Sequence, residues 1–320
     1  MLTPQQLDRA VGAVTASAAG DALGAPYEFR ASTLPPTPIT LHAAPPWGLG
    51  EWTDDTSMAV PILQAVARHK PLDDAHTLAA IVGEWIGWAR HAKDVGLQTR
   101  AVLAGIRHVT EKDARASALA VHREAGRSAG NGSLMRTGPV ALGYLSDGQA
   151  DALASAARRV SELTHHETDA GDACVIWSLA IRAAILTGGL EVRTAVDTLP
   201  AERAALWHSR LDDAEAVLPW ELAGNNGWVV VSLQAAWSAL THSSSLREVL
   251  ELAVRSGNDT DTVAAIAGSL AGAVHGAAAV PTEWLAVLHG WPADEFRAFG
   301  AAELAELVRK AVSPIAEEHA

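Results

Sequence analysis

Apolar positions recur along the chain with the 3.6-residue period of an α-helix, and few segments show the alternation typical of strands. The first helix should begin at Thr3-Pro4, a capping residue followed by proline, and end at the interruption Asp21 to Gly24. The period predicts helices over residues 4–20, 55–69, 73–92, 97–110, 115–125, 138–145, 149–164, 169–187, 191–198, 202–215, 227–241, 245–255, 261–279, 283–289 and 301–312. This pattern predicts an all-α fold.

The segments between these helices carry proline, glycine and unusual polar residues. Five prolines fall between Leu34 and Gly50, which predicts a long surface loop. Glycine interrupts the pattern at Gly130-Asn131-Gly132, Gly224 to Gly227 and Gly257-Asn258. Nothing has the composition of a linker and no fixed-period repeat is present, so we expect a single domain over residues 1–320.

Composition narrows the class of protein. Hydrophobic residues make up 49% of the 320 residues, enough for a sizeable core, and 11 of the 16 aromatic residues are tryptophan. The 24 Lys and Arg residues against 37 Asp and Glu give a formal charge of −13, which argues against general binding to nucleic acids or anionic membranes. The polar start of the chain and the lack of a long apolar run predict a soluble, cytoplasmic protein. A single cysteine, Cys174, excludes an internal disulfide framework and is most simply an inert core thiol.

Two acidic motifs stand immediately before apolar helices. Glu51 to Thr56 reads EWTDDT, and Gly257 to Thr262 reads GNDTDT. Each alone could simply cap a helix, because Thr and Asp are favoured caps and acids complement the helix dipole. If the two helix starts face each other, four carboxylates crowd into one volume, those of Asp54, Asp55, Asp259 and Asp261. Oxygen ligands of this kind suit Mg²⁺ or Mn²⁺, and four carboxylates are enough for two ions.

Three further motifs could contact a ligand. Glu28 follows the segment GDALGAPY, whose glycines indicate close backbone packing. The loop Gly130 to Ser133 could hold a phosphate on its N–H groups or be an ordinary turn. Arg136 could pair with that phosphate or, as is commoner, with a buried carboxylate.

Two other positions carry side chains suited to ligand contact. The adjacent His165 and His166 point in different directions on a helix, so only one is expected to contact a ligand or make a structural hydrogen bond. Trp228, beside Gly227, is the best candidate for stacking on a flat ligand.

The ordered motifs GDALGAPYEF, TDDTSM, GNGSLMR, TH, GWVVVSLQAAW and NDTDTVAAIAGSLAGAVHG resemble the ADP-ribosylglycohydrolase family, which includes the dinitrogenase-reductase-activating glycohydrolase and the ADP-ribosyl-acceptor hydrolases. The likeness runs over roughly residues 10–280. It implies a compact, orthogonal multi-helix bundle around a central dinuclear Mg²⁺ or Mn²⁺ site. Two departures stand out: Asn258 where relatives usually have glycine, and Val231-Ser232 in place of a more polar pair.

The resemblance also implies roles for individual residues. The metal ligands would be Thr53, Asp54, Asp55, Asp259, Asp261 and Thr262, and the catalytic residues Glu28, Asp54 and Asp261. Residues Gly130, Asn131, Gly132 and Ser133 would hold the phosphates and His165 would contact the ligand. Trp228 would lie near the distal ribose or the adenine.

The expected function is metal-dependent hydrolysis of the bond between ADP-ribose and an acceptor, with the acceptor left open among arginine, serine, an O-acetyl group, a nucleobase and other small molecules. A glycosidic bond breaks through an oxocarbenium-like state and needs an activated water, which Glu28 or an aspartate would orient or deprotonate. We expect a monomer acting on an ADP-ribosylated protein or small molecule. Two alternatives stay open: a non-catalytic ADP-ribose-binding or crystallin-like protein, and a metal-dependent phosphoester hydrolase.

Overall fold

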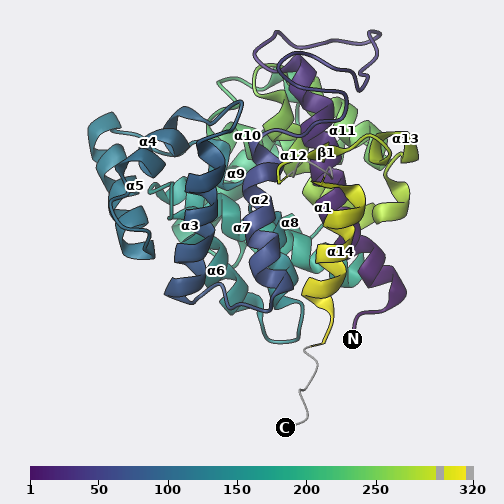
Figure 1. The fold of residues 1–320 in the computed structure, drawn as a ribbon. Helices are drawn as coiled ribbons and strands as arrows, with labels where there is room; N and C mark the ends of the chain where they lie inside the picture. Colours follow the sequence, from purple (N-terminus) through teal and green to yellow (C-terminus); the bar gives the residue numbers. More distant parts are fainter. Residues whose placement is uncertain (293–298, 315–320) are drawn as a thin grey trace.

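The computed structural model describes residues 1–292 and 299–314 (Figure 1). Its α-helices are α1 (Pro4–Gly24), α2 (Asp54–Ala67), α3 (Ala75–Ala89), α4 (Leu97–Gly105), α5 (Glu111–Ala125), α6 (Ala150–Ser161), α7 (Thr168–Thr187), α8 (Val192–Val196), α9 (Ala201–Glu215), α10 (Val229–Thr241), α11 (Leu246–Val254), α12 (Thr260–His275), α13 (Thr282–Leu285) and α14 (Ala301–Val312). Short 3₁₀ helices are η1 (Ala25–Tyr27), η2 (Asn131–Ser133), η3 (Gly138–Tyr144), η4 (Pro219–Glu221) and η5 (Ala277–Ala279). The predicted all-α class is confirmed.

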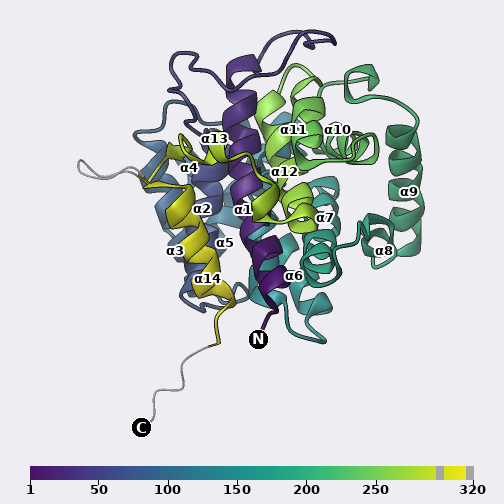
Figure 2. The same cartoon turned by 90° about the vertical axis from the view of Figure 1, so that its right-hand side faces the viewer.

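Helices α1 and α12 form the centre of the molecule and make the most extensive contact between any two helices of the described residues. They lie side by side in both ribbon views. Figure 1 shows α3 to α5 on one flank of the molecule, and Figure 2 shows α8 and α9 at the edge opposite α3. Glycines allow this close approach: a Cβ on Gly12 would lie 2.4 Å from the carbonyl oxygen of Gly272. This packing brings the end of α1 beside the start of α12.

Helix α1 does not end at Asp21, as the glycines predicted, but continues to Gly24. Thr3 and Gln6 form a capping box at its start, with Pro4 in the first turn, as expected. At the other end, a Cβ on Gly24 would lie 2.4 Å from the Cα of Asp261, so this turn packs directly on the α12 backbone. Tertiary packing therefore overrides the weak helix propensity of this segment.

Other element boundaries differ from the pattern more modestly. The predicted helix over residues 138–145 is the 3₁₀ helix η3, and the one over residues 283–289 is reduced to α13. A short antiparallel pair joins β1 (His289–Gly290) to β2 (Phe299–Gly300), which the pattern did not predict. The predicted range 301–312 matches α14.

One helix of the described residues, α7, is long enough and on average apolar enough to cross a bilayer, although Asp172 and Arg182 interrupt its apolar sequence. In the structure, 78% of the apolar stretch of this helix is buried inside the molecule.

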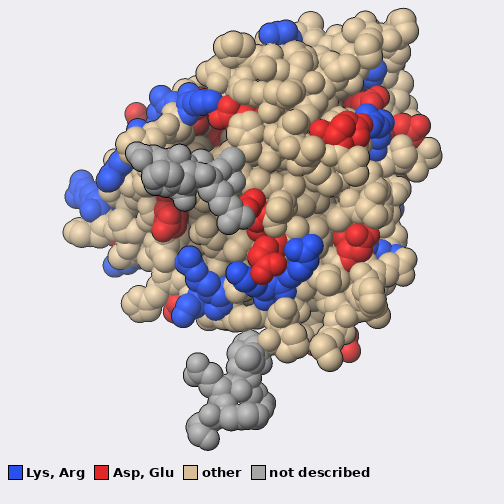
Figure 3. Space-filling model, turned by 45° about the vertical axis from the view of Figure 1, so that its right-hand side comes forward, with Lys and Arg blue, Asp and Glu red and all other residues tan. Residues whose placement is uncertain are grey.

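The charged side chains of both signs are mixed on the surface. On the face shown in Figure 3, the visible Lys and Arg side chains lie interspersed with Asp and Glu side chains.

Replacing Gly24 by alanine is expected to destabilise the protein and to reduce activity, because the new Cβ would push the Asp261 backbone away from the end of α1. We expect a cost of about 1–3 kcal/mol in the free energy of unfolding, measured by urea denaturation. Gly87→Ala, on the exposed side of α3 where nothing lies within 4 Å of the added Cβ, is the matched control and should stabilise the helix slightly. Equal stability of the two variants would contradict this close packing.

Candidate functional site

A cavity of about 800 Å³ opens where the starts of α2 and α12 meet the loops after α1, α3 and α5. Acidic residues, a glycine loop and aromatic residues line it. Its walls include Glu28, Phe29, Trp47, Asp54, Asp94, Gln98, Gly130, Asn131, Gly132, His165, Gly227, Asp259, Asp261 and Thr262.

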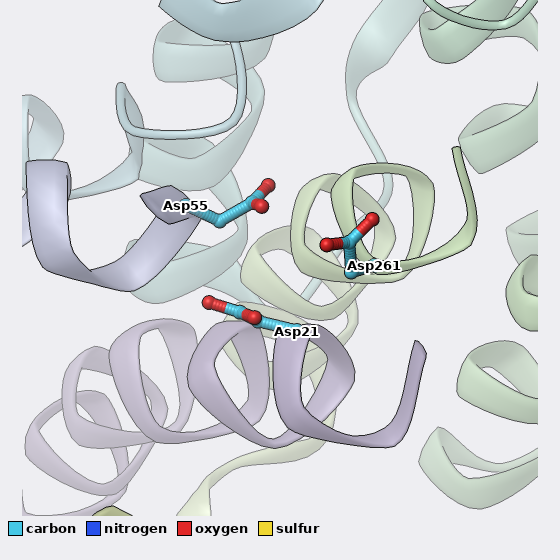
Figure 4. Close-up of side chains that lie close together, drawn as sticks. All are labelled: Asp21, Asp55 and Asp261. Carbon is cyan, nitrogen blue, oxygen red and sulfur yellow. The ribbon is translucent and has the colours of Figure 1, made fainter. Parts of the chain in front are cut away.

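The two acidic motifs, about two hundred residues apart, meet at this cavity. Carboxylate oxygens of Asp21, Asp55 and Asp261 lie within 4.8 Å of one another, and so do those of Glu28, Asp259 and Asp261. Figure 4 shows Asp21, Asp55 and Asp261 reaching toward one another from α1, α2 and α12. Asp54 belongs to neither group but lines the cavity beside them. Asp261 is common to both groups and so stands at the centre of the cluster.

The threonine and aspartate at the two helix starts do not act as simple caps. Thr53 and Asp259 occupy the N-cap positions of α2 and α12, yet neither side chain makes the capping hydrogen bond. The Thr53 hydroxyl lies 3.0 Å from Oδ2 of Asp55 and 3.3 Å from Oδ2 of Asp261. The Thr262 hydroxyl lies 3.4 Å from the same oxygen of Asp55. These polar groups face the acidic cluster, which capping alone does not explain.

Asp21 is a site residue that sequence reasoning assigned no role. One carboxylate oxygen accepts the N–H of Thr53 at 2.8 Å, and the other accepts the N–H and the hydroxyl of Thr56 at 2.9 and 2.7 Å. Asp21 therefore caps α2 from another helix. The signal in the sequence was an acid enclosed by Gly20 and Gly24, which indicated close packing without showing its partner.

Because its oxygens are already occupied, Asp21 supports the cluster more than it offers ligand atoms. Asp55 differs: its Oδ1 atom is buried and has no hydrogen-bond partner among the described residues. An unpaired buried carboxylate oxygen is costly, so this atom is suited to face a cation.

Burial and mutual repulsion raise the pKa values of the cluster. The pKa of Glu28 is raised to about 8 by burial and then by Asp259 and Asp54, and the pKa of Asp54 to about 7 by burial and then by Asp94. Burial raises the pKa of Asp21 to about 6 against its hydrogen bonds, and those of Asp55 and Asp261 well above the usual range. Either protonation of some of these carboxylates or a bound cation would therefore stabilise the cluster.

The glycine loop forms η2 and is held against the start of α10. The Asn131 N–H donates to the carbonyl of Gly227 at 3.1 Å, and its side-chain amide donates to Oδ2 of Asp259 at 2.7 Å. Gly130, Asn131 and Gly132 line the cavity, whereas Ser133 is fully buried and does not appear among the lining residues. The Asn131 side chain thus links the loop to the acidic cluster.

His165 is buried against this loop and lines the cavity. A Cβ on Gly130 or on Gly132 would lie 3.3 Å from its ring, so the two glycines make room for the imidazole. Its neighbour His166 is exposed. Burial, followed by the charge of Arg136, holds the pKa of His165 well below its ordinary value.

One sequence expectation fails in the geometry. Arg136 pairs with no carboxylate of the described residues and does not line the cavity; its guanidinium lies over the Trp85 ring at 4.2 Å. Trp228 is 44% exposed, forms a backbone bridge with Gly130 of the cavity wall and has the Arg210 guanidinium 5.8 Å from its ring, so its contact with a ligand stays a prediction. Phe29, 80% exposed, and Trp47 also line the cavity, and neither was predicted as a site residue.

Both departures from the family pattern are accommodated locally. Asn258 has φ of 55°, the left-handed conformation that glycine adopts freely and asparagine tolerates, so Asp259 follows a glycine-like backbone. Ser232 is buried and accepts a hydrogen bond from the Asn131 side chain at 3.0 Å. Neither substitution displaces a residue of the acidic cluster.

Comparison with known proteins agrees with this geometry. A sequence model of the ADP-ribosylglycohydrolase family matches residues 2–316. The chain is 30% identical over 297 residues to "ADP-ribosylarginine hydrolase Tri1" of Pseudomonas putida (strain GB-1), covering 89% of this chain and 75% of that protein. It is 29% identical to "ADP-ribosyl-[dinitrogen reductase] glycohydrolase" of Rhodospirillum rubrum, covering 90% and 92%. A solved "ADP-ribosylglycohydrolase-related protein complex" aligns with a TM-score of 0.72 and 27% identity over 97% of this chain and 99% of that one.

The fold and the site together define a helical protein with a buried cluster of carboxylates at a cavity that acidic, glycine and aromatic residues line. Such a cluster suits hydrolysis at a polar, oxygen-rich substrate. The chain belongs to the ADP-ribosylglycohydrolase family, whose reaction class is hydrolysis of a glycosidic bond of ADP-ribose.

Proposed function

We propose that this protein removes ADP-ribose from arginine side chains of modified proteins by hydrolysing the N-glycosidic bond. One observation carries the proposal: two sets of three acidic residues, which share Asp261, meet at a cavity that the glycine loop Gly130–Gly132 also lines. Two of its relatives are named ADP-ribosylarginine hydrolase, from Pseudomonas putida and Serratia proteamaculans. That the protein acts as a monomer in the cytoplasm stays a prediction.

The lining of the cavity supports arginine as the acceptor. A guanidinium group is a planar cation, recognised by carboxylates and by the faces of aromatic rings. The cavity presents Glu28 and Asp94 together with Phe29 and Trp47. Lys93 already lies over the Trp47 ring, 5.3 Å from its centroid, which shows that this wall accommodates a cation. This combination of carboxylates and aromatic rings suits a guanidinium better than an uncharged serine hydroxyl.

The donor set fits divalent cations, and we propose two, Mg²⁺ or Mn²⁺. The residues that would hold them are Thr53, Asp54, Asp55, Asp259, Asp261 and Thr262, all of which offer hard oxygen ligands. The unpaired Oδ1 atom of Asp55 and the raised pKa values of the cluster support this assignment. When bound, the cations supply Lewis-acid stabilisation of negative charge during hydrolysis.

In the proposed mechanism, the backbone N–H of Gly132 and the His165 ring hold the diphosphate, because the N–H groups of Gly130 and Asn131 already donate to Gln98 and to the carbonyl of Gly227. The oxygen of the attacking water bonds to the anomeric carbon of the ribose, and Glu28 accepts a proton from that water. The carbon–nitrogen bond breaks and its electron pair goes to the guanidine, which then takes up the proton held by Glu28. The products are ADP-ribose and a free arginine side chain.

The test is a panel of arginine-, serine- and O-acetyl-linked ADP-ribose, each assayed with Mg²⁺, with Mn²⁺ and with a chelator. Release of intact ADP-ribose from the arginine conjugate, lost with the chelator, would support the proposal. Preference for another linkage would overturn the choice of acceptor. Binding without release would favour a non-catalytic ADP-ribose-binding protein, and AMP with ribose phosphate a phosphoester hydrolase.

Metal-free protein is expected to lose stability as pH rises from about 4 to about 8. The carboxyl pKa values are raised in the folded state, to about 8 for Glu28 and about 7 for Asp54, so the folded state binds more protons than the unfolded state in this window. The carboxylates left at pH 8 attract cations instead. Added Mg²⁺ or Mn²⁺ should therefore raise Tm more at pH 8 than at pH 5; an equal rise at both would contradict the proposal.

A further inference from the structure

Arg136 is a fully buried cation without a carboxylate partner among the described residues. Besides its stacking on Trp85, it donates a hydrogen bond from Nη2 to the hydroxyl oxygen of Thr164 at 2.6 Å. Burial lowers its pKa to about 10, which still leaves it charged at neutral pH. A buried, unpaired charge is expensive, so the contact with Thr164 calls for an explanation beyond packing.

Thr164 transmits this contact to His165. A guanidinium can only donate, so the Thr164 oxygen must accept from Arg136 and its single hydrogen is left to donate elsewhere. Nδ1 of His165 lies 2.7 Å from that oxygen. In the part of the chain that the structure describes, no other partner of the Thr164 hydroxyl is within hydrogen-bond distance. Nδ1 is therefore an acceptor, and the proton of the neutral imidazole is on Nε2.

Nε2 is the nitrogen on the cavity side of the ring. It would lie 3.3 Å from a Cβ on Gly130 and 3.4 Å from one on Gly132, so it faces the glycine loop. A proton on Nε2 gives the cavity wall a hydrogen-bond donor beside the glycine loop. The other tautomer would present a lone pair there, which would repel an anionic oxygen.

We propose that Arg136 and Thr164 are positioning residues that hold His165 in the Nε2–H tautomer, so that its ring donates a hydrogen bond to an anionic oxygen of the diphosphate. The choice of ligand rests on the proposed function. The direction of the hydrogen bonds rests only on contacts within the protein. Neither Arg136 nor Thr164 needs to touch the substrate.

The experiment compares Thr164→Val, which keeps the shape but removes the hydroxyl, with Thr164→Ser, which restores it. Long-range ¹H–¹⁵N spectra of histidine-labelled protein report the tautomer, and His165→Gln identifies the His165 signals. Wild type and T164S should show Nε2–H, whereas T164V should shift to Nδ1–H or to a mixture. Calorimetry should show ADP-ribose binding weakened by roughly 10- to 100-fold in T164V and by no more than a few-fold in T164S.

Two results would overturn the proposal: an Nδ1–H tautomer in the wild type, or unchanged tautomer and affinity in T164V. The wild-type spectrum alone can therefore decide against it, even if T164V folds poorly. If the wild type shows Nε2–H but binds no ADP-ribose, the proposed function fails while the assigned tautomer stands. If the wild type binds ADP-ribose with an Nδ1–H ring, only the present proposal fails.

Discussion

Replacing Asp261 by asparagine is expected to lower kcat by about 10³-fold or more while the protein remains folded. Asp261 is the carboxylate common to both acidic groups, and its oxygen lies 3.3 Å from the Thr53 hydroxyl. Asparagine keeps the shape and can still accept the Thr262 N–H, now 3.0 Å from Oδ1, but it removes the negative charge. Turnover of an ADP-ribosylarginine peptide measures the effect.

For the stability of the same variant, D261N, we expect no loss. Removing one of several repelling buried carboxylates should leave Tm of the metal-free protein unchanged or raise it, because burial and Asp55 raise the pKa of Asp261. Asp213→Asn, an exposed position on α9, is the matched control and should change neither quantity. Turnover within a few-fold of wild type in D261N would contradict the central place of Asp261.

Glu28→Gln is expected to lower kcat by about 10²- to 10⁴-fold, the range for loss of a general base. Glu28 follows η1, is half-buried and lines the cavity beside Asp259 and Asp261. Glutamine keeps the size of the side chain but cannot accept the proton of the attacking water. Affinity for ADP-ribose, measured by calorimetry, should change by no more than a few-fold.

The pH dependence distinguishes a base from a binding residue. A general base must be deprotonated, so wild-type kcat should fall as pH falls through the pKa of Glu28. Bound cations would set that pKa below the value of about 8 that burial and neighbouring acids produce without them. E28Q should lose this acidic limb, and Glu124→Gln, exposed on α5, should keep it. An acidic limb that persists unchanged in E28Q would assign the base to another group.

The course of α1 shows where local reasoning failed. Gly20, Asp21 and Gly24 are poor helix formers, so the sequence pattern predicted that the helix ends there. In the structure, the missing side chains of Gly20 and Gly24 let α1 approach α12, and Asp21, on the same turns of α1, caps the start of α2. The same residues that weaken a helix locally strengthen it through packing.

Arg136 shows a second limit. Its residue type suggested a phosphate or carboxylate partner. The structure places it over the Trp85 ring instead. A guanidinium can pair with a carboxylate, a phosphate or an aromatic ring, and which pair forms depends on the groups that the fold brings near it.

What the sequence by itself determined is local: the helical class, the capped start of α1 and the two acidic motifs at helix starts. Periodicity and capping act within a few residues, so they can be read along the chain. Only the tertiary structure decided which oxygens face one another, that Asp21 completes the cluster, and that Arg136 and Thr164 orient His165. Those contacts join residues that are far apart along the chain or depend on the direction of one hydrogen bond, and the close packing of α1 on α12 brings the acids together.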